Sequence, residues 1–522
     1  MTLPMNLAWW IIDQLIQQGV TQFCVSPGSR STPLVHAAAH HPKAKTTVHF
    51  DERGIAFFAL GIGKATGSPA AVITTSGTAV GNLMPATMEA YHSRIPLLLL
   101  TADRPHELRD CGANQTTDQV KFFPNVTRWS MDLTSSFDEK MARSIAAQAY
   151  FHATSRPQGP IQLNCPFQEP LYAPPHPLPK GDPMPQSHPK LVAPPLKVEA
   201  KRGVILLGPV QNPTAVLKLA AELRWPVFAD LLSNGRTSPT PEQIRYFDYL
   251  IRAPSDLKPD LILHFGGRFV SKHILDWEKE APFIHVSSDP FLQDPSRRVT
   301  QRIHSDIDPF CQTFQADSEP GWLEIWQEKD HELDQIIESQ FQSPPLEAHL
   351  YRTLPSDRPL FLGNGLPVRD ADHFFFPKTA HRFFCNRGLS GIDGNIATVA
   401  GLSDGLGTPL VAVIGDQAAL HDLNSLSLLK NRPILLIISN NFGGGIFEHL
   451  PVAESPIFET HFAAAHHWHF EMAAKMFDLP YIRCSEPLST WPTSGIVELI
   501  TDRKKNAQFQ RELIQSCSLA LV

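Results

Sequence analysis

The chain has 522 residues, a net charge of −7 at pH 7 and 42% hydrophobic residues, which is the composition of an ordinary globular protein. A length of this order predicts about three domains. The absence of a long basic run argues against nucleic acid as a partner, and no stretch is long and apolar enough to predict insertion into a membrane. The seven cysteines are scattered without a CxxC pair, which is typical of a reducing compartment, so we expect a cytoplasmic protein.

Short apolar runs alternate with helical patterns in three successive blocks, which predicts an α/β fold of three doubly wound parallel-sheet domains. We expect a first domain over residues 1–172, a proline-rich linker over 173–200, a central Rossmann-like domain with a charged helical connector over 201–345, and a third domain over 346–522. The predicted strands are 22–26, 47–50, 70–74 and 96–101 in the first block and 203–207, 226–229, 261–265 and 283–287 in the second.

Two apolar runs near the C-terminus predict neighbouring parallel strands. The first, 411–415, ends at Asp416, and the second, 434–439, ends just before Asn441, with leucines between them that predict an amphipathic helix over 418–430. Adjacent parallel strands lie about 4.8 Å apart, so the two polar side chains would lie together at the carboxyl edge of the sheet. A Mg²⁺ ion with oxygen ligands fits there and keeps positions free for phosphate oxygens. The alternative is a polar turn after each strand.

The sequence HFDERG places Glu52 at the start of a predicted helix, directly after a strand. The helix dipole favours an acidic residue in the first turn, so a structural role would suffice to explain it. Thiamine diphosphate, however, requires a carboxyl group that shares a proton with its aminopyrimidine ring. Together with the predicted metal site, this requirement favours a catalytic role for Glu52.

The segment SPGSRSTP follows the first predicted strand. Gly28 permits a tight turn, and Ser29 or Ser31 can cap the helix that follows. Arg30, at the carboxyl edge of the sheet, is suited to bind a carboxylate with two hydrogen bonds, and Arg104 follows the fourth predicted strand in the same way. A solvated surface arginine is the alternative interpretation of Arg30.

Two further segments in the C-terminal part of the chain contain residue types that could bind a phosphate or a metal. The glycine-rich segment 385–401, with Arg387 near its start, offers backbone amides to a phosphate. The four histidines of HFAAAHHWHF, within 461–470, match no zinc signature, so we interpret this segment as the end of an amphipathic helix.

With these residues in view, the chain resembles the thiamine-diphosphate enzymes and, within them, the MenD family of synthases. The strings that carry the resemblance are SPGSRSTPL, HFDERG, TSGTAV, LNCPFQEPLY, NRGLSGIDG, GDQAALHDLN and NNFGGGIF. The resemblance implies that thiamine diphosphate and Mg²⁺, with Mn²⁺ as an alternative metal, are the cofactors. It also implies decarboxylation of 2-oxoglutarate and conjugate addition of the resulting succinyl carbanion equivalent to isochorismate, in menaquinone biosynthesis.

Position by position, the resemblance implies roles for individual residues. Glu52 matches the catalytic glutamate. The residues implied to contact the cofactor are Glu52, Ser390, Gly391, Asp416, Ala418, Ala419, Asn441, Gly443, Ile446 and Phe447, and the implied metal ligands are Asp416, Asn441 and the Gly443 carbonyl. The implied substrate-binding residues are Ser29, Arg30, Arg104, Gln115, Lys272 and Arg387. The family also implies a homodimer or homotetramer with active sites at subunit interfaces.

The two implied substrates together carry four carboxylates, so we expect the three arginines and Lys272 to converge on one cleft. A carboligase of the acetolactate synthase type is one alternative, although small neutral acceptors do not require this many arginines. A non-catalytic binding protein that retains the fold is another. Gln417 and Ala418, which replace residues common in relatives, favour that alternative, whereas Glu52, Asp416 and Asn441 argue against it.

Overall fold

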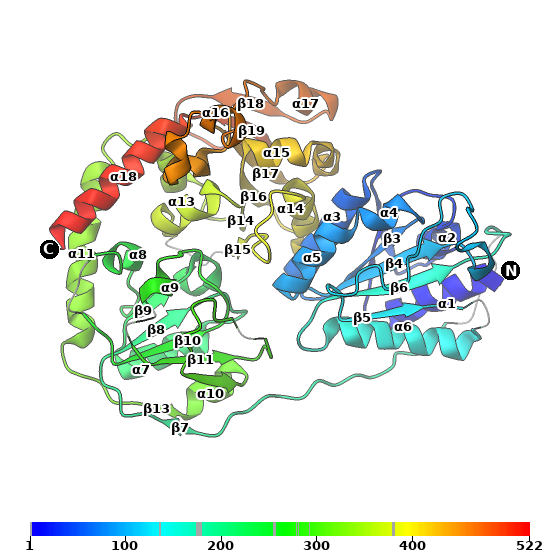
Figure 1. The fold of residues 1–522 in the computed structure, drawn as a ribbon, viewed down its shortest axis with the longest axis horizontal. Helices are drawn as coiled ribbons and strands as arrows, with labels where there is room; N and C mark the ends of the chain where they lie inside the picture. Colours follow the sequence, from blue (N-terminus) through cyan, green and yellow to red (C-terminus); the bar gives the residue numbers. More distant parts are fainter. Residues whose placement is uncertain are drawn as a thin grey trace.

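The structure of this protein is a computed structural model that describes residues 3–134, 137–173, 180–237, 239–253, 257–277, 279, 281–291, 293–377 and 382–521. Three α/β units follow one another along the chain, and the third contacts both of the others (Figure 1). The described strands of each unit pair in parallel, and helices cover both faces of each large sheet, so the predicted fold class is confirmed. No helix among the described residues is both long and apolar enough to cross a lipid bilayer.

The first sheet has the strand order β2-β1-β3-β4-β6-β5. Helices α1, α2 and α6 cover one face and α3 and α5 cover the other, which explains why its central strands are apolar throughout. The elements of this unit are α1 (Leu3–Gln17), β1 (Gln22–Val25), α2 (Thr32–His40), β2 (Lys45–Val48), α3 (Glu52–Thr66), β3 (Ala70–Thr74), α4 (Thr78–Gly81), α5 (Met84–Ser93), β4 (Leu97–Asp103), β5 (Trp129–Asp132), α6 (Glu139–Thr154) and β6 (Pro160–Pro166).

The second sheet has the order β12-β11-β10-β8-β9, in which β12 is an edge strand that the sequence pattern did not predict. The proline-rich linker has no regular structure over residues 180–195 and reaches the second unit through β7 (Figure 1). The elements are β7 (Leu196–Lys197), β8 (Gly203–Leu207), α7 (Thr214–Leu223), β9 (Val227–Ala229), α8 (Phe247–Leu250), β10 (Leu261–Phe265), α9 (Ile274–Trp277), β11 (Phe283–Ser287), β12 (Gln301–His304), α10 (Ile307–Thr313), β13 (Phe314–Gln315) and α11 (Trp322–Gln340).

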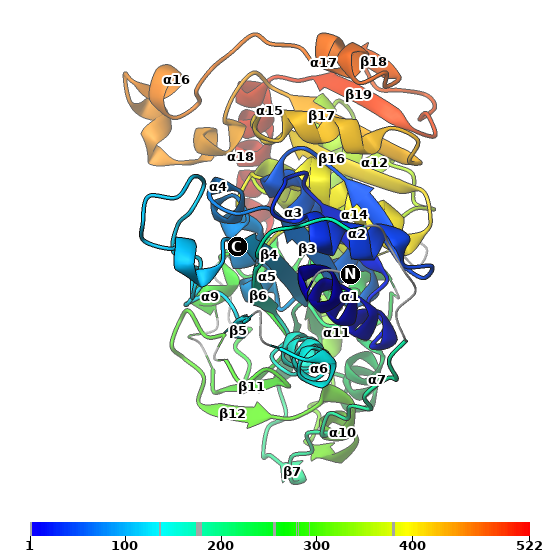
Figure 2. The ribbon, with the colours of Figure 1, turned by 90° about the vertical axis from the view of Figure 1, so that its right-hand side faces the viewer.

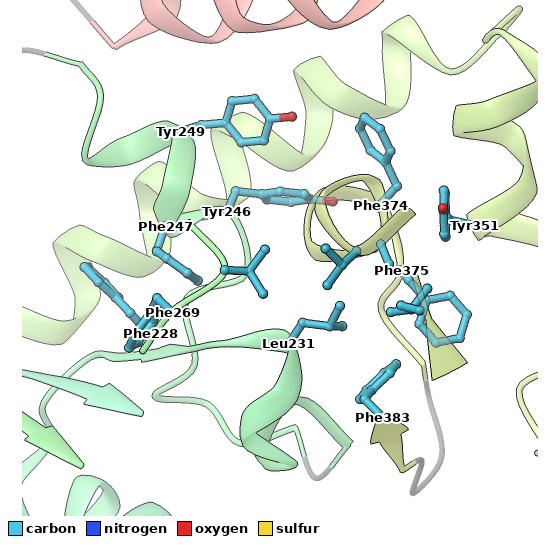
Figure 3. Packing of buried hydrophobic residues seen from close by; sticks show 14 of the residues in the cluster. Phe228, Leu231, Tyr246, Phe247, Tyr249, Phe269, Tyr351, Phe374, Phe375 and Phe383 are labelled. Atoms are coloured by element: carbon cyan, nitrogen blue, oxygen red, sulfur yellow. The ribbon is translucent and has the colours of Figure 1, made fainter. Parts of the chain in front are cut away.

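Aromatic side chains join the second and third units in one core. Figure 3 shows Tyr246 of the second unit with its ring directed toward Phe374 of the third unit. Buried Arg236 of the second unit donates a hydrogen bond of 2.7 Å to the carboxylate of Asp372 in the third. The two units are therefore held together by both apolar packing and a buried ion pair.

The third sheet has the order β15-β14-β16-β17-β19-β18. The two predicted strands near the C-terminus are β16 and β17, which are neighbours, with Gly415 opposite Ser439. The elements are α12 (Leu346–Thr353), β14 (Leu360–Leu362), α13 (Leu366–Phe374), β15 (Phe383–Phe384), α14 (Asn395–Leu406), β16 (Leu410–Gly415), α15 (Asp416–His421), β17 (Ile434–Asn440), α16 (Phe458–His461), α17 (Glu471–Met476), β18 (Tyr481–Cys484), β19 (Gly495–Ile500) and α18 (Arg503–Ala520).

The prediction of one continuous helix over residues 418–430 is wrong. Helix α15 ends at His421, and a 3₁₀ helix, η5 (Leu423–Leu429), follows it. The buried Asp422 carboxylate separates the two, because it accepts hydrogen bonds from the Ala397 amide at 3.0 Å and from Ser425 Oγ at 2.7 Å. Leucines at every third position fit a 3₁₀ helix, which has three residues per turn, as well as they fit one face of an α-helix.

Helices α3 and α14 pack closely, joining the first unit to the third (Figure 2). A Cβ atom on Gly61 would lie 2.2 Å from the carbonyl oxygen of Thr398, and one on Gly401 would lie 1.9 Å from that of Phe58. Only glycine allows the two backbones to approach this closely. The contact fixes α3, whose first residue is Glu52, against the third unit.

Candidate active site

Asp416 and Asn441 lie directly after the adjacent strands β16 and β17, as predicted from the sequence. The Asp416 carboxylate accepts a hydrogen bond of 2.9 Å from the Gly443 amide, and Asn441 Nδ2 donates one of 3.0 Å to Glu347. Asn441 Oδ1 is buried and has no hydrogen-bond partner among the described residues. An unpaired buried oxygen beside a carboxylate is a suitable ligand for a hard divalent cation.

The turn after β17 requires glycine at two positions. Gly443 has a φ of +154°, and a Cβ atom there would lie 2.7 Å from the carbonyl oxygen of Ala463. A Cβ atom on Gly445 would lie 2.6 Å from Asn441 Nδ2. The Gly443 carbonyl accepts a hydrogen bond of 3.0 Å from the Gly445 amide, and its second lone pair remains for a metal. The two glycines therefore allow the turn to pack closely against Ala463 and Asn441.

A pocket lies between this turn and helices α12 and α13. Among the described residues, those lining it all come from the third unit: Glu347, Leu350, Tyr351, Asn364, Gly365, Leu366, Pro367, Asp370, Ile392, Gly415, Asp416, Gln417, Ala418, Ser439, Asn441, Gly443, Gly444, Gly445 and Ile446. Burial raises the pKa of the Glu347 carboxyl, and the nearby charge of Asp416 raises it further. Sequence reasoning missed Glu347, Asn364 and Asp370, since none belongs to a local motif.

Four other residues implied to contact the cofactor, Ala419, Phe447, Ser390 and Gly391, are not among the residues that line this pocket. Ala419 is buried, and Phe447 packs edge-on against Phe462. The Gly391 carbonyl accepts a hydrogen bond of 2.8 Å from Asn364, and Ser390 is exposed with a φ of +60°. Of these four residues, Gly391 is joined to the pocket lining by its hydrogen bond with Asn364.

The amides at the start of the glycine-rich segment are not available to a phosphate, which corrects the expectation for this turn. The amides of Gly388 and Leu389 each donate a hydrogen bond of 2.9 Å to the carboxylate of Glu89 in the first unit. Gly394 has a different role, because a Cβ atom there would lie 2.0 Å from the ring of Phe57. These glycines therefore serve contact between the first and third units.

The helix end predicted at the four histidines is confirmed only for His461, where α16 ends, because the residues that follow up to Phe470 form a loop. The Glu498 carboxylate holds this loop by accepting hydrogen bonds from His469 Nδ1 at 2.8 Å and from the Phe470 amide at 2.9 Å. His466 Nε2 lies 3.3 Å from Asp416 Oδ2. No group of three or more His, Cys, Asp or Glu side chains within the described ranges could hold a metal ion.

Glu52 is the first residue of α3, but it does not cap the helix. The neighbouring residue Asp51 does so, accepting hydrogen bonds from the amides of Arg53 at 2.9 Å and Gly54 at 3.4 Å. The Glu52 carboxylate accepts one hydrogen bond, of 3.2 Å, from Asn82. No hydrogen bond or ion pair joins Glu52 to the lining of the pocket within the described part of this chain.

Arg30 is buried, with 7% of its surface exposed, so the interpretation as a solvated arginine is wrong. Its guanidinium donates a hydrogen bond of 2.9 Å to the Phe167 carbonyl. Burial, together with the positive charge of Arg104, lowers the pKa of Arg30. Arg104 donates to Ser76 Oγ, and Gln115 Nε2 donates to the Ser76 carbonyl at 2.9 Å. Two neighbouring arginines and a glutamine are thus gathered at the carboxyl edge of the first sheet.

The serines of the same loop do not cap α2. Ser31 is the residue before the helix, yet its hydroxyl donates to the Gly28 carbonyl at 2.9 Å and makes no side-chain cap. Ser29 is exposed, and its carbonyl accepts a hydrogen bond from the Thr32 amide. The turn is closed by these local bonds, which leaves the Ser29 side chain available to a ligand.

The remaining two predicted cations, Lys272 and Arg387, lie in the second and third units. Lys272 is exposed and follows Ser271, whose hydroxyl donates to Asp248. Arg387 is half-buried, and its positive charge lowers the pKa of Arg369, which burial also lowers. No contact joins these residues to the Arg30 group among the described residues. The convergence of all four cations on one cleft therefore stays a prediction.

Comparison with known proteins relates this geometry to a family. Residues 5–122 match the profile of the thiamine pyrophosphate enzyme N-terminal TPP binding domain, and residues 187–362 match that of the middle domain of thiamine pyrophosphate. The 2-succinyl-5-enolpyruvyl-6-hydroxy-3-cyclohexene-1-carboxylate synthase of Rubrobacter xylanophilus is 38% identical, with 97% of each chain covered. The proteins of the same name from Salinibacter ruber and Pelodictyon phaeoclathratiforme are 36% and 38% identical, and cover 98% and 96% of this chain and 96% and 94% of their own.

The three parallel-sheet units and the two profile matches define a thiamine pyrophosphate enzyme. The relatives are similar over nearly the whole of both chains, and these matches span both the Glu52 and the Asp416 regions. The chain belongs to the family of 2-succinyl-5-enolpyruvyl-6-hydroxy-3-cyclohexene-1-carboxylate synthases.

Proposed function

We propose that this protein catalyses the synthase reaction of menaquinone biosynthesis. In that reaction 2-oxoglutarate loses its carboxylate as CO₂, and the succinyl unit that remains adds to isochorismate. The observation that carries the proposal is the full-length similarity to synthases of this name, at 36–38% identity. Within this chain, the gathered arginines support acidic substrates over the small neutral acceptors of an acetolactate synthase.

Mg²⁺ would be held by Asp416, Asn441 Oδ1 and the Gly443 carbonyl. The fit is supported by the unpaired buried oxygen of Asn441 and by the all-oxygen ligand set, which Mg²⁺ prefers and Mn²⁺ accepts. The backbone of the turn from Gly443 to Gly445 lines the pocket and would lie beside the diphosphate and the metal. Thiamine diphosphate, when bound, supplies the carbon nucleophile that attacks the 2-oxo group.

Glu52 would hold a proton at the ring nitrogen of the aminopyrimidine, which is the group that general acid–base catalysis requires at this position. Its availability supports this role, because Asp51 already caps the helix and Glu52 has only Asn82 as a partner among the described residues. Arg30, Arg104, Lys272 and Arg387 would bind substrate carboxylates, with Ser29 and Gln115 as neutral donors. Each charge-assisted hydrogen bond contributes roughly 1.5–3 kcal/mol.

We infer further that one active site is built from two chains, in a homodimer or a homotetramer. The absence of any described contact between Glu52 and the pocket supports this assembly. Apolar side chains are exposed beside both regions: Val48 and Phe50 at 61% and 62% near Glu52, and Leu389 and Ile392 at 46% and 42% near the pocket. Exposed apolar groups of this kind mark surfaces that another protein covers.

The proposed function is tested by supplying purified protein with 2-oxoglutarate, isochorismate, thiamine diphosphate and Mg²⁺, and omitting each in turn. We expect loss of isochorismate and release of CO₂ in equal amounts, only when all four are present. Replacing 2-oxoglutarate with pyruvate is the discriminating control. Turnover with pyruvate and none with 2-oxoglutarate would contradict the proposal and favour a carboligase of the acetolactate synthase type.

A further inference from the structure

We propose that Glu347 is a positioning residue, which orients the side-chain amide of Asn441 so that Oδ1 faces the metal. The inference rests on the proposed function, because it takes Asn441 as a Mg²⁺ ligand. Glu347 is the second residue of α12 and is buried, with 4% of its surface exposed.

Glu347 Oε1 is the acceptor of three side-chain hydrogen bonds. It accepts hydrogen bonds from Asn441 Nδ2 at 3.0 Å, from Ser439 Oγ at 3.0 Å and from Thr501 Oγ1 at 2.7 Å. Ser439 belongs to β17, Asn441 directly follows that strand, and Thr501 directly follows β19. Three donors on one oxygen identify that oxygen as an acceptor, so only the NH₂ end of Asn441 can face it.

This contact decides which way the Asn441 amide points. The two ends of an amide have nearly the same shape but opposite hydrogen-bonding character. A rotation of the Asn441 amide would place its oxygen against Glu347 Oε1, without a hydrogen bond and with electrostatic repulsion. In the observed orientation Oδ1 points away from Glu347 and is left buried without a partner among the described residues. An unpaired buried acceptor is costly, unless a ligand such as a metal ion occupies it.

The amide is also confined on a second side, because Gly445 lies so close that a Cβ atom there would be 2.6 Å from Asn441 Nδ2. The NH₂ end therefore lies between the Gly445 backbone and Glu347. Residues that orient metal ligands typically contribute 10- to 100-fold to metal affinity. We expect Glu347 to act in this way, without itself touching the metal.

The test is the dissociation constant for Mg²⁺ at saturating thiamine diphosphate, measured by calorimetry. Glu347→Ala should raise it about 10- to 100-fold. Glu347→Gln should raise it only about twofold, because glutamine can pair with either end of the Asn441 amide and leaves about half of the molecules competent. The glutamine variant keeps the volume of the side chain, so it remains informative if the alanine variant does not fold.

A rescue variant separates positioning from packing. A carboxylate presents an oxygen to the metal in either orientation, so Glu347→Ala combined with Asn441→Asp should bind Mg²⁺ nearly as well as Asn441→Asp alone. The matched control is Asp330→Asn, which changes a buried carboxyl of helix α11 that accepts a hydrogen bond from the Tyr246 amide at 2.7 Å and does not line the pocket. Its Mg²⁺ affinity should equal that of the wild-type protein.

Wild-type affinity in the folded Glu347→Ala variant would overturn the inference, and so would a loss that Asn441→Asp does not rescue. A different result would contradict the metal site on which the inference rests. If the wild-type protein with thiamine diphosphate does not bind Mg²⁺ at all, the proposed metal site is wrong and the inference falls with it. A third combination overturns the inference and leaves the proposed metal site intact. In it, the wild-type protein binds Mg²⁺, Asn441→Ala does not, and Glu347→Ala binds Mg²⁺ with normal affinity.

Discussion

The amide of Gly443 donates a hydrogen bond of 2.9 Å to Asp416 Oδ2, so the turn after β17 is tied to the first residue after β16. This hydrogen bond between two groups of the protein fixes the arrangement of the small polar site at the carboxyl edge of the third sheet. Asp416 Oδ1 is likewise engaged, by the amide of Gln417 at 2.7 Å. The carboxylate is thus held in one orientation before any cofactor binds, which lowers the entropic cost of binding.

Replacing Gly443 with alanine should weaken binding of thiamine diphosphate with Mg²⁺ by at least about tenfold, because the turn must shift to relieve the contact with Ala463. The dissociation constant is measured by quenching of tryptophan fluorescence. Gly67→Ala is the matched control: it also has a positive φ, of +71°, but a Cβ atom there meets nothing within 4 Å. The Gly67→Ala variant should be less stable than the wild type and should bind thiamine diphosphate with Mg²⁺ as tightly as the wild type does. Equal affinities in both variants would show that the turn does not bind the cofactor.

Glu52→Gln should lower kcat roughly 10²- to 10⁴-fold, the range for a general acid–base group, while cofactor affinity stays close to that of the wild type. Asp51→Ala is its control. Loss of the cap of α3 should cost about 0.5–2 kcal/mol of stability, seen as a lower Tm, with kcat near the wild-type value. Near-normal turnover in Glu52→Gln would remove Glu52 from the catalytic role.

Arg30→Ala should lower kcat/KM for isochorismate by about one to two orders of magnitude, which corresponds to one charge-assisted hydrogen bond. Cofactor affinity should not change, because Arg30 is proposed to bind a substrate carboxylate and is not among the residues that line the pocket. Glu169→Gln removes the exposed acidic partner of Arg30, 3.4 Å away, and should leave both stability and kcat/KM unchanged. Unaltered kinetics in Arg30→Ala would return Arg30 to a structural role at the Phe167 carbonyl.

Asp422 should make stability depend on pH. Burial raises its pKa from 3.8 to about 6, against the lowering effect of the hydrogen bonds from Ala397 and Ser425. The folded protein keeps this proton at pH values where the unfolded chain has lost it. The stability that the group contributes is therefore complete below pH 3.8 and is lost as the pH rises to about 6. The loss should amount to about 3 kcal/mol.

Urea unfolding of the wild type and of Asp422→Asn from about pH 4 to pH 7 measures this effect. The wild type should lose stability relative to the variant as the pH rises through this range. A difference in unfolding free energy that does not change with pH would mean that Asp422 is ionised throughout.

The parts of the site that could be predicted from the sequence are those that depend on local patterns. Buried strands are recognisable as short β-branched runs, and a strand–helix–strand unit places its strand ends at one edge, so the adjacency of Asp416 and Asn441 followed directly. Glu52 was identifiable because its motif is contiguous. The predicted strands needed little correction for the same reason, but β5, β6 and β12 were not predicted.

The remaining residues act through contacts that no local pattern reveals. Glu89 is 299 residues from Gly388, and Glu347 is 94 residues from Asn441. A single acidic residue in an ordinary helix carries no sign of such a partner. The Asp422 carboxylate broke the predicted helix for a similar reason, since it bonds to a distant amide. The Asp404 carboxylate likewise has a non-local partner, because it accepts two hydrogen bonds, of 2.8 and 2.9 Å, from Arg432.

The most direct test of a site shared between two chains is complementation of two inactive variants. Glu52→Gln and Asp416→Ala, each inactive alone, are co-expressed with different tags, and the mixed oligomer is isolated by two successive affinity steps. If Glu52 of one chain acts with Asp416 of another, one of the two sites in a mixed dimer is intact, and about half of the wild-type activity should return. If both residues act within one chain, every site in the mixed dimer carries a defect, and an inactive mixed oligomer would contradict the shared site.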